Sequence, residues 1–255
     1  MIGSKELHHE AKAALKGGAF SRLTIQYLLI LYAATAAVEL ATMLFEDRLI
    51  IIRELHIEFF IWSGALSLLL RLFKSAWEVG HQSGALRTGR KQTLSFPVLA
   101  DGLRQFERFT ALLLLKAFFI AVWTMLLIVP GVIAFYRYRM AEKLMLDDPA
   151  LSPLDALRKS AELMDGRKKA LLHLDLSFWK HYLIIFVLEF GVRVAEFLGY
   201  PLEGLTLQIG TFCLSTVLLI LAEWHELPTV QTAYACFYDH ALSARQSDAP
   251  AETPH

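Results

Sequence analysis

Cysteine and net charge are both scarce in this sequence. Its two cysteines, Cys213 and Cys236, are too few for the disulfide framework that holds small secreted proteins together. Cys213 lies within an apolar run, so we expect it to pack in a core. Lysine and arginine total 25, as do aspartate and glutamate. The basic residues cluster in segments that a cytoplasmic location explains, so they give no reason to expect a nucleic-acid partner.

Recognised catalytic and cofactor motifs are also missing. The chain has no Gly-x-Ser-x-Gly elbow and no Gly-rich phosphate loop followed by Lys-Ser/Thr. It has nine histidines, but none shows the paired spacing of a zinc site. The closest groups are His8-His9-Glu10, His173-Leu-Asp175 and His225-Glu226. We therefore expect no enzyme activity, no cofactor and no bound metal.

Long apolar runs dominate what is present. Hydrophobic residues make up 55% of the chain, charged residues 20%, and the mean hydropathy is +0.43. Several runs approach the ~20 residues that a helix needs to cross a bilayer. We predict an all-α, polytopic membrane protein with about six transmembrane helices plus amphipathic interfacial helices. The predicted spans lie near 23–45, 57–77, 109–129, 132–146, 171–198 and 205–222, within a single domain 1–245 followed by a disordered tail 246–255.

Two segments outside these spans have the pattern of amphipathic helices. Residues 4–16 begin at a possible cap, Ser4, and end at Gly17-Gly18; this helix is either an interfacial anchor drawn to anionic lipid or a plain solvated helix. Residues 152–166 begin with a Ser152 cap, and Gly166 is the expected stop. The intervening segment 81–108 is predicted to be a polar loop with a short surface helix within 94–106.

The region after the third predicted span is ambiguous. Pro130-Gly131 is expected to break the helix, and Val132 to Leu146 is either a fourth span or an interfacial segment. Basic residues concentrate at the N-terminus, in 81–108 and in 152–169, which places these segments in the cytoplasm. That arrangement requires either a return through 132–146 or a re-entrant third span. We favour the return, which gives six crossings with both termini cytoplasmic.

A carboxylate near the start of the fifth predicted span needs a partner. Asp175 stands a turn or two inside this span, where a bare charge is costly. The neighbouring antiparallel segment offers Arg139 and Lys143, so we predict an ion pair between Asp175 and one of them. The alternative is that Asp175 meets only interfacial water.

The block from residue 126 to 178 resembles a known family. It contains Leu-Leu-Ile-Val-Pro-Gly-Val-Ile (126–133) and Leu-Asp-Leu-Ser-Phe (174–178), and the matching positions form a candidate structural motif. These positions are Pro130, Gly131, Asp148, Pro149, Ser152, Asp155, Ser160, Gly166, Lys168, Asp175 and Ser177. Together with the opening Glu6-Leu-His-His-Glu, they resemble the bacterial integral-membrane family called "domain of unknown function 975". The resemblance implies a multi-pass bacterial membrane protein and carries over no activity.

Three functions remain open at this point. The first is a non-enzymatic scaffold, assembly factor or lipid-contacting helper in the cell membrane, whose partners are lipids, other membrane proteins or further copies of itself. The second is a small transporter or channel with a polar path near Lys116, for which Glu189 is the next candidate. The third, an intramembrane enzyme, lacks any evident pair of nucleophile and base. A wet cavity around Lys116 would favour the transporter.

Overall fold

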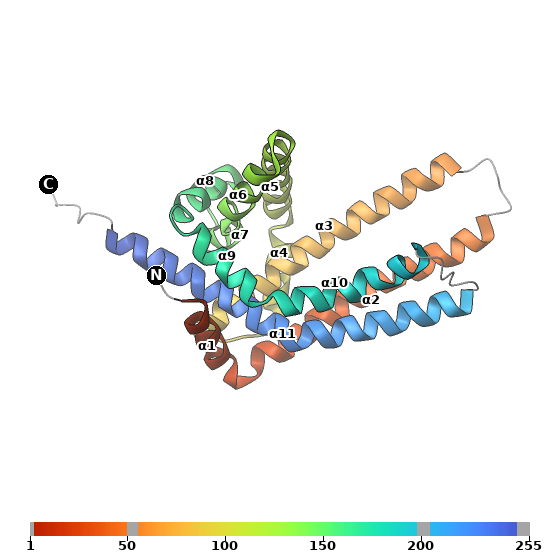
Figure 1. Cartoon of the computed structure of the whole chain (residues 1–255), viewed down its shortest axis with the longest axis horizontal. Coiled ribbons are helices and arrows are strands. Elements are labelled where there is room, and N and C mark those ends of the chain that lie inside the picture. Colours follow the sequence, from red (N-terminus) through yellow and green to blue (C-terminus); the bar gives the residue numbers. More distant parts are fainter. Residues whose placement is uncertain (1–2, 50–55, 198–204, 249–255) are drawn as a thin grey trace.

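The computed structural model describes residues 3–49, 56–197 and 205–248, and all regular secondary structure in these ranges is helical. The elements are α1 (Ser4–Ala14), η1 (Leu15–Gly17), α2 (Ala19–Leu49), α3 (His56–Gly89), η2 (Phe96–Ala100), α4 (Asp101–Arg104), α5 (Phe106–Leu126), α6 (Ile128–Arg137), α7 (Ala141–Asp147), α8 (Pro153–Leu163), α9 (Lys168–Ser177), α10 (Trp179–Phe197) and α11 (Leu205–Asp248). In Figure 1, α2, α3, α10 and α11 extend away from the end of the molecule where α1 begins and α11 finishes.

Two of the long helices run further than the sequence predicted. Helix α3 continues to Gly89, so the first part of the predicted 81–108 loop is helical. Helix α11 continues through Pro228 to Asp248, and residues 246–248 of the predicted tail are therefore helical as well; the remainder of that tail lies outside the described residues. Pro228 cannot donate the backbone hydrogen bond of its position, yet α11 continues on both sides of it.

Helices α5 and α6 form an antiparallel hairpin whose break is not where we predicted it. The chain turns at Leu127, which has the extended torsions φ −162° and ψ 146°, and not at Pro130-Gly131. Pro130 lies in the first turn of α6. Backbone N–H groups in a first turn have no acceptor within the helix, so a proline there costs no helical hydrogen bond. Gly131 faces α5 so closely that a Cβ there would lie 2.2 Å from Thr124 Oγ1.

The predicted fourth and fifth spans are both interrupted. The segment 132–146 is divided between α6 and α7 by a turn at Tyr138–Met140, so it is not one crossing helix. The ten residues of α6 extend only about 15 Å at the helical rise of ~1.5 Å per residue. The segment 171–198 is divided at Phe178, where α9 and α10 are bent by 59°.

The N-terminal helix packs on the rest of the chain. Its cap is Gly3 and not Ser4, and the Gly3 N–H donates to Glu6 Oε2 at 3.0 Å. Leu7 and Ala11 are buried in a core that α1 shares with α9 and α11, so this face is covered by protein.

The prediction that Cys213 packs in a core is wrong, because its side chain is exposed on α11.

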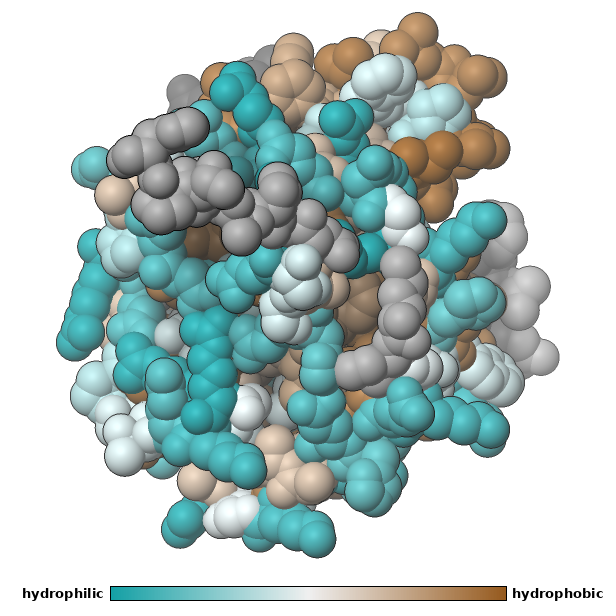
Figure 2. All heavy atoms as spheres, turned by 90° about the vertical axis from the view of Figure 1, so that its left-hand side faces the viewer, coloured by the Kyte–Doolittle hydropathy of each residue, from teal (hydrophilic) through white to brown (hydrophobic). Residues whose placement is uncertain are grey.

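Three described helices are long and apolar enough to cross a membrane. They comprise Ala19–Val38, Phe106–Leu126 and Ile209–Ser247, and the bent pair α9–α10 makes a fourth if it counts as one span. Figure 2 shows the end of the molecule where α1 begins and α11 finishes. Hydrophilic side chains cover most of this face, and hydrophobic ones gather at the top, where Figure 1 places α5 and α6. The protein is therefore all-helical and consistent with residence in a membrane.

Candidate functional site

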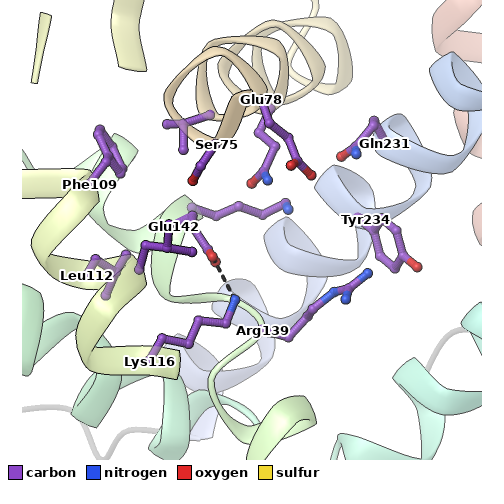
Figure 3. Close-up of a pocket in the computed structure, with 13 residues that line it drawn as sticks. Ser75, Glu78, Phe109, Leu112, Lys116, Arg139, Glu142, Gln231 and Tyr234 are labelled. Atoms are coloured by element: carbon purple, nitrogen blue, oxygen red, sulfur yellow. Dashed lines mark hydrogen bonds and ion pairs between the residues drawn. The ribbon is translucent and has the colours of Figure 1, made fainter. Parts of the chain in front are cut away.

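A polar cavity of about 230 Å³ lies where four parts of the fold meet. Its walls come from α3, from α5, from the α6–α7 turn with α7, and from α11 (Figure 3). The lining side chains are Ser75, Glu78, Val79, Gln82, Phe109, Leu112, Leu113, Lys116, Arg139, Glu142, Lys143, Gln231 and Tyr234. Two acids and three bases thus surround a space of small-molecule size, in a chain otherwise rich in apolar side chains.

One acid and one base in the cavity neutralise each other. Lys116 Nζ on α5 and Glu142 Oε1 on α7 are 2.6 Å apart, and the two side chains are 13% and 16% exposed. Burial alone would raise the pKa of Glu142, but the Lys116 ammonium holds it below its ordinary value. This ion pair ties α5 to α7 across the cavity (Figure 3).

Lys143 is the most deeply buried charged residue of the cavity. It is only 5% exposed, and its Nζ lies 5.8 Å from the centre of the Tyr234 ring. Among the described residues, no carboxylate forms an ion pair with it. Burial lowers the pKa of Lys143 to about 8, although the nearby Glu142 carboxylate opposes this shift. The protonated amine is thus held at a cost to the fold.

Arg139 and Glu78 also face the cavity without ion pairs to other described residues. The Arg139 guanidinium carbon lies 4.9 Å from the Phe135 ring centre and 5.0 Å from that of Tyr234. Such placement over aromatic faces is a favourable cation–π arrangement. Glu78 extends from α3 on the opposite wall, near Gln231 (Figure 3). The cavity therefore presents basic groups on one side and a carboxylate on another.

The turn that carries these bases depends on Ser160 of α8. The Ser160 hydroxyl donates to the Arg137 carbonyl at 2.9 Å and accepts from the Met140 N–H at 3.2 Å. Both backbone groups lie at the break between α6 and α7, where helical partners are lacking. A fully buried side chain from α8 thus completes the backbone hydrogen bonding on either side of Arg139.

Asp175 does not form the predicted ion pair. Its carboxylate accepts a 2.8 Å hydrogen bond from the Tyr136 hydroxyl and a second from the Tyr234 hydroxyl. Arg139 lies over the ring of Tyr234, and the hydroxyl of that tyrosine is the group that binds Asp175. The carboxylate joins α9 to α6 and α11 through two neutral donors, which meet the need for a partner without an opposite charge.

The other candidate motif residues serve local structure and lie away from the cavity lining. In the α7–α8 loop, Asp148 accepts from the Ala150 N–H, Pro149 follows it, and Ser152 accepts from the Asp155 N–H at 3.2 Å. Beyond α8, Gly166 has φ 69°, Lys168 lies 3.4 Å from Asp165, and Ser177 donates to the Leu174 carbonyl. The structure thus gathers none of these residues into a reactive centre.

Part of the cavity could be predicted from the sequence. Lys116 was singled out as a deep charge and borders the cavity, whereas the side chain of Glu189 lies outside the described residues. Glu78 was missed because it lies between the predicted span 57–77 and the predicted loop 81–108 and was assigned to neither. The signal for Glu142 and Lys143 was two adjacent opposite charges within the apolar run 132–146.

The buried amine of Lys143 gives a testable pH dependence. Its pKa is about 8 in the fold against an ordinary 10.5, so between these values the unfolded chain binds more protons. The cost of burying the charge is present below the lower value and disappears as the pH rises. Between about pH 7.5 and 9.5, we expect the free energy of unfolding to rise by about 2 kcal/mol relative to Lys143→Met. Paired thermal unfolding scans would measure this; an equal response in both proteins contradicts it.

The family called "Protein of unknown function (DUF975)" matches residues 104–246, which is more than half of the chain. The matched range contains α5 to α10, most of α11 and the bases of the cavity, whereas Glu78 and α1 lie before it. No curated protein and no solved structure matches the chain. The comparisons therefore place the chain among a group of similar sequences and carry no information about its activity.

Proposed function

Because the chain belongs to the DUF975 family, we propose that it is a non-enzymatic multi-pass protein of the bacterial cell membrane. In this role it contacts lipid through an apolar helical hairpin and acts as a scaffold or assembly helper. The observation that carries the proposal is the tip of the α5–α6 hairpin, where Met125 is 88% and Ile128 76% exposed. We call this the apolar tip; it comprises Val122, Trp123, Met125, Leu126, Leu127, Ile128, Val129, Val132 and Ile133.

Lipid is the occupant that best fits the apolar tip. Contiguous exposed apolar side chains are disfavoured in water and mark surfaces that contact a membrane or another protein. The tip continues the apolar run of α5, which is itself long enough to cross a bilayer. In contrast, α6 reaches only about half of the ~30 Å hydrocarbon core. A hairpin that enters and leaves on the same side accommodates both helices.

This geometry also suggests how the chain threads. The long helices α2, α3, α10 and α11 would cross, and the α5–α6 hairpin would enter from the cytoplasm, in place of the third and fourth of six spans. The number of crossings stays even, so both termini remain cytoplasmic. The hydrophilic face around the start of α1 (Figure 2) and the basic residues of 152–169 support this side.

Spin labels on single cysteines test the lipid contact. In a variant with Cys213 and Cys236 replaced by alanine, a label at Ile128 should be accessible to oxygen and shielded from a water-soluble nickel complex. A label at Lys159, which is half exposed on α8, is the matched control and should respond in the opposite way. In intact cells, an impermeant thiol reagent should fail to reach Lys159→Cys. Equal nickel accessibility at both sites would place the tip in water and contradict the proposal.

The cavity around Lys116 favours a second candidate, a small transporter or channel. Transporters bind solutes at polar groups enclosed by helices, and this cavity has five charged side chains in its lining. Solute flux in reconstituted vesicles distinguishes the two candidate functions. A transporter requires solute flux that falls in Lys116→Met, whereas a helper shows the same low flux in both proteins.

A further inference from the structure

The charges that line the cavity do not balance. Lys116 and Glu142 compensate each other at 2.6 Å. Of the remaining groups, Arg139 and Lys143 are basic and Glu78 is acidic, so the lining has an excess of one positive charge when all five are ionised. Such an excess is costly in a buried space, because the charged form loses the hydration that it has in water. One singly charged anion would neutralise it.

Lys143 is a buried base of the cavity that forms no ion pair among the described residues. Its ammonium has three donors, yet the described residues offer it an aromatic face and no carboxylate within ion-pair distance. Buried charges in proteins are usually paired or bound to a ligand. A chain that needed only to fill this position could carry a leucine or methionine. A buried base in the lining of a cavity, without an ion pair to any described carboxylate, points instead to an external partner.

We propose that the cavity binds one anionic oxygen group, a phosphate or a carboxylate, between Arg139 and Lys143. The two bases project from the same α6–α7 region, four residues apart, and both line the cavity. A guanidinium binds oxyanions with its planar pair of N–H groups, and an ammonium adds a compact point charge. Glu78 on the α3 wall is then placed to accept a hydrogen bond from a hydroxyl or amino group of the same ligand (Figure 3).

The dimensions of the cavity limit the ligand. Its volume of about 230 Å³ falls below the ~300 Å³ lower end of pockets for drug-sized ligands. A free phosphate, a small carboxylate or the headgroup of an anionic phospholipid fits this limit. Leu114 and Phe118, on the same helix as Lys116, are exposed and apolar, so acyl chains could continue from a bound headgroup along α5. This inference concerns the cavity alone and does not depend on lipid contact at the apolar tip.

Thermal unfolding of the full chain in a non-ionic detergent tests the proposal, because a ligand that binds only the folded state raises the unfolding midpoint. Three additions are compared near neutral pH at matched ionic strength: sodium phosphate, sodium acetate, and micelles that contain phosphatidylglycerol. Sodium chloride and phosphatidylcholine are the references. We expect at least one of the three additions to raise the midpoint of the wild type. A response to phosphate or acetate identifies a free anion, and a response to phosphatidylglycerol alone identifies a headgroup.

Two variants decide whether such a response comes from the cavity. Lys143→Met keeps the length of the side chain but removes its charge, and it should abolish the response while raising the midpoint without ligand. Lys159→Met removes a half-exposed charge on α8 and should leave the response unchanged. The proposal is overturned if no addition shifts the wild type, or if Lys143→Met responds as strongly as Lys159→Met. Arg139→Gln, which should also lose the response, gives an independent check.

Discussion

Replacing Gly80 with alanine is expected to destabilise the protein strongly, whereas the same change at Gly64 should be neutral or slightly stabilising. Both glycines lie in α3, where alanine is favoured over glycine by about 1 kcal/mol. A Cβ at Gly80 would lie 1.9 Å from the Leu99 carbonyl oxygen, but a Cβ at Gly64 meets nothing within 4 Å. Gly64 is therefore a matched control within the same helix.

The cost at Gly80 is high because the obstruction is backbone. A flexible side chain could move away, but the Leu99 carbonyl belongs to η2, and η2 is held by a second close approach nearby. There a Cβ at Gly102 would lie 1.9 Å from the Ala76 carbonyl oxygen. Overpacking typically costs about 1–3 kcal/mol, and we expect Gly80→Ala to reach or exceed the upper end. Unfolding midpoints measure the effect; a midpoint equal to that of Gly64→Ala would mean that α3 and η2 do not pack at this separation.

The second large effect is expected for Arg90→Met. Arg90 follows α3 and binds Asp147 at the end of α7 through two hydrogen bonds of 2.7 and 2.8 Å. It also binds Asp239 of α11 at 2.7 Å, and Tyr238 donates to the same Asp147 carboxylate. Neighbouring carboxylates and hydrogen-bonded partners raise the pKa of Arg90 well above its ordinary value, so the cation persists at every pH at which the protein folds.

Loss of Arg90 leaves two carboxylates facing each other without a cation between them. These side chains are about 30% exposed, so water screens part of the repulsion. We expect a loss of about 2–3 kcal/mol, measured by denaturant or thermal unfolding. Arg104→Met is the control: the Arg104 side chain is 65% exposed, its contact with Asp101 is 3.6 Å long, and Asp101 keeps Arg87 as a closer partner, so the loss should be at most about 1 kcal/mol.

The double replacement of Asp147 and Asp239 by asparagine should restore part of the stability of Arg90→Met, since it removes the uncompensated charge. Equal stability of Arg90→Met and Arg104→Met would show that Arg90 does not hold α3, α7 and α11 together. Absence of any restoration would show that the lost hydrogen bonds, and not the repulsion, account for the effect.

Local features of this fold could be predicted from the sequence. The Ser152 cap and the turn at Gly166 depend on residues a few positions away, and their chemistry is visible in the chain itself. Apolar runs likewise indicated α2 and α5, because a long uninterrupted run has few alternatives to a buried or membrane-facing helix.

Features that depend on distant contacts could not be predicted. The break between α5 and α6 falls at Leu127 because the first turn of a helix tolerates Pro130, and because Gly131 lets α6 pack closely on Thr124. The partner of Asp175 was sought among opposite charges, although tyrosine hydroxyls on two other helices fill that role. The ion pair of Lys116 with Glu142 joins residues on separate helices, and no local pattern connects them.

The dependence of the α6–α7 turn on Ser160 has a consequence for the order in which the protein is assembled. During synthesis, Arg137 and Met140 leave the ribosome about 20 residues before Ser160, so their backbone groups at first have only water as a partner. The hairpin can form early, but the α6–α7 turn at its base is fixed only when α8 supplies the Ser160 hydroxyl. Arg139 and Lys143, which flank that base, therefore reach their final positions after translation has passed the segment they belong to.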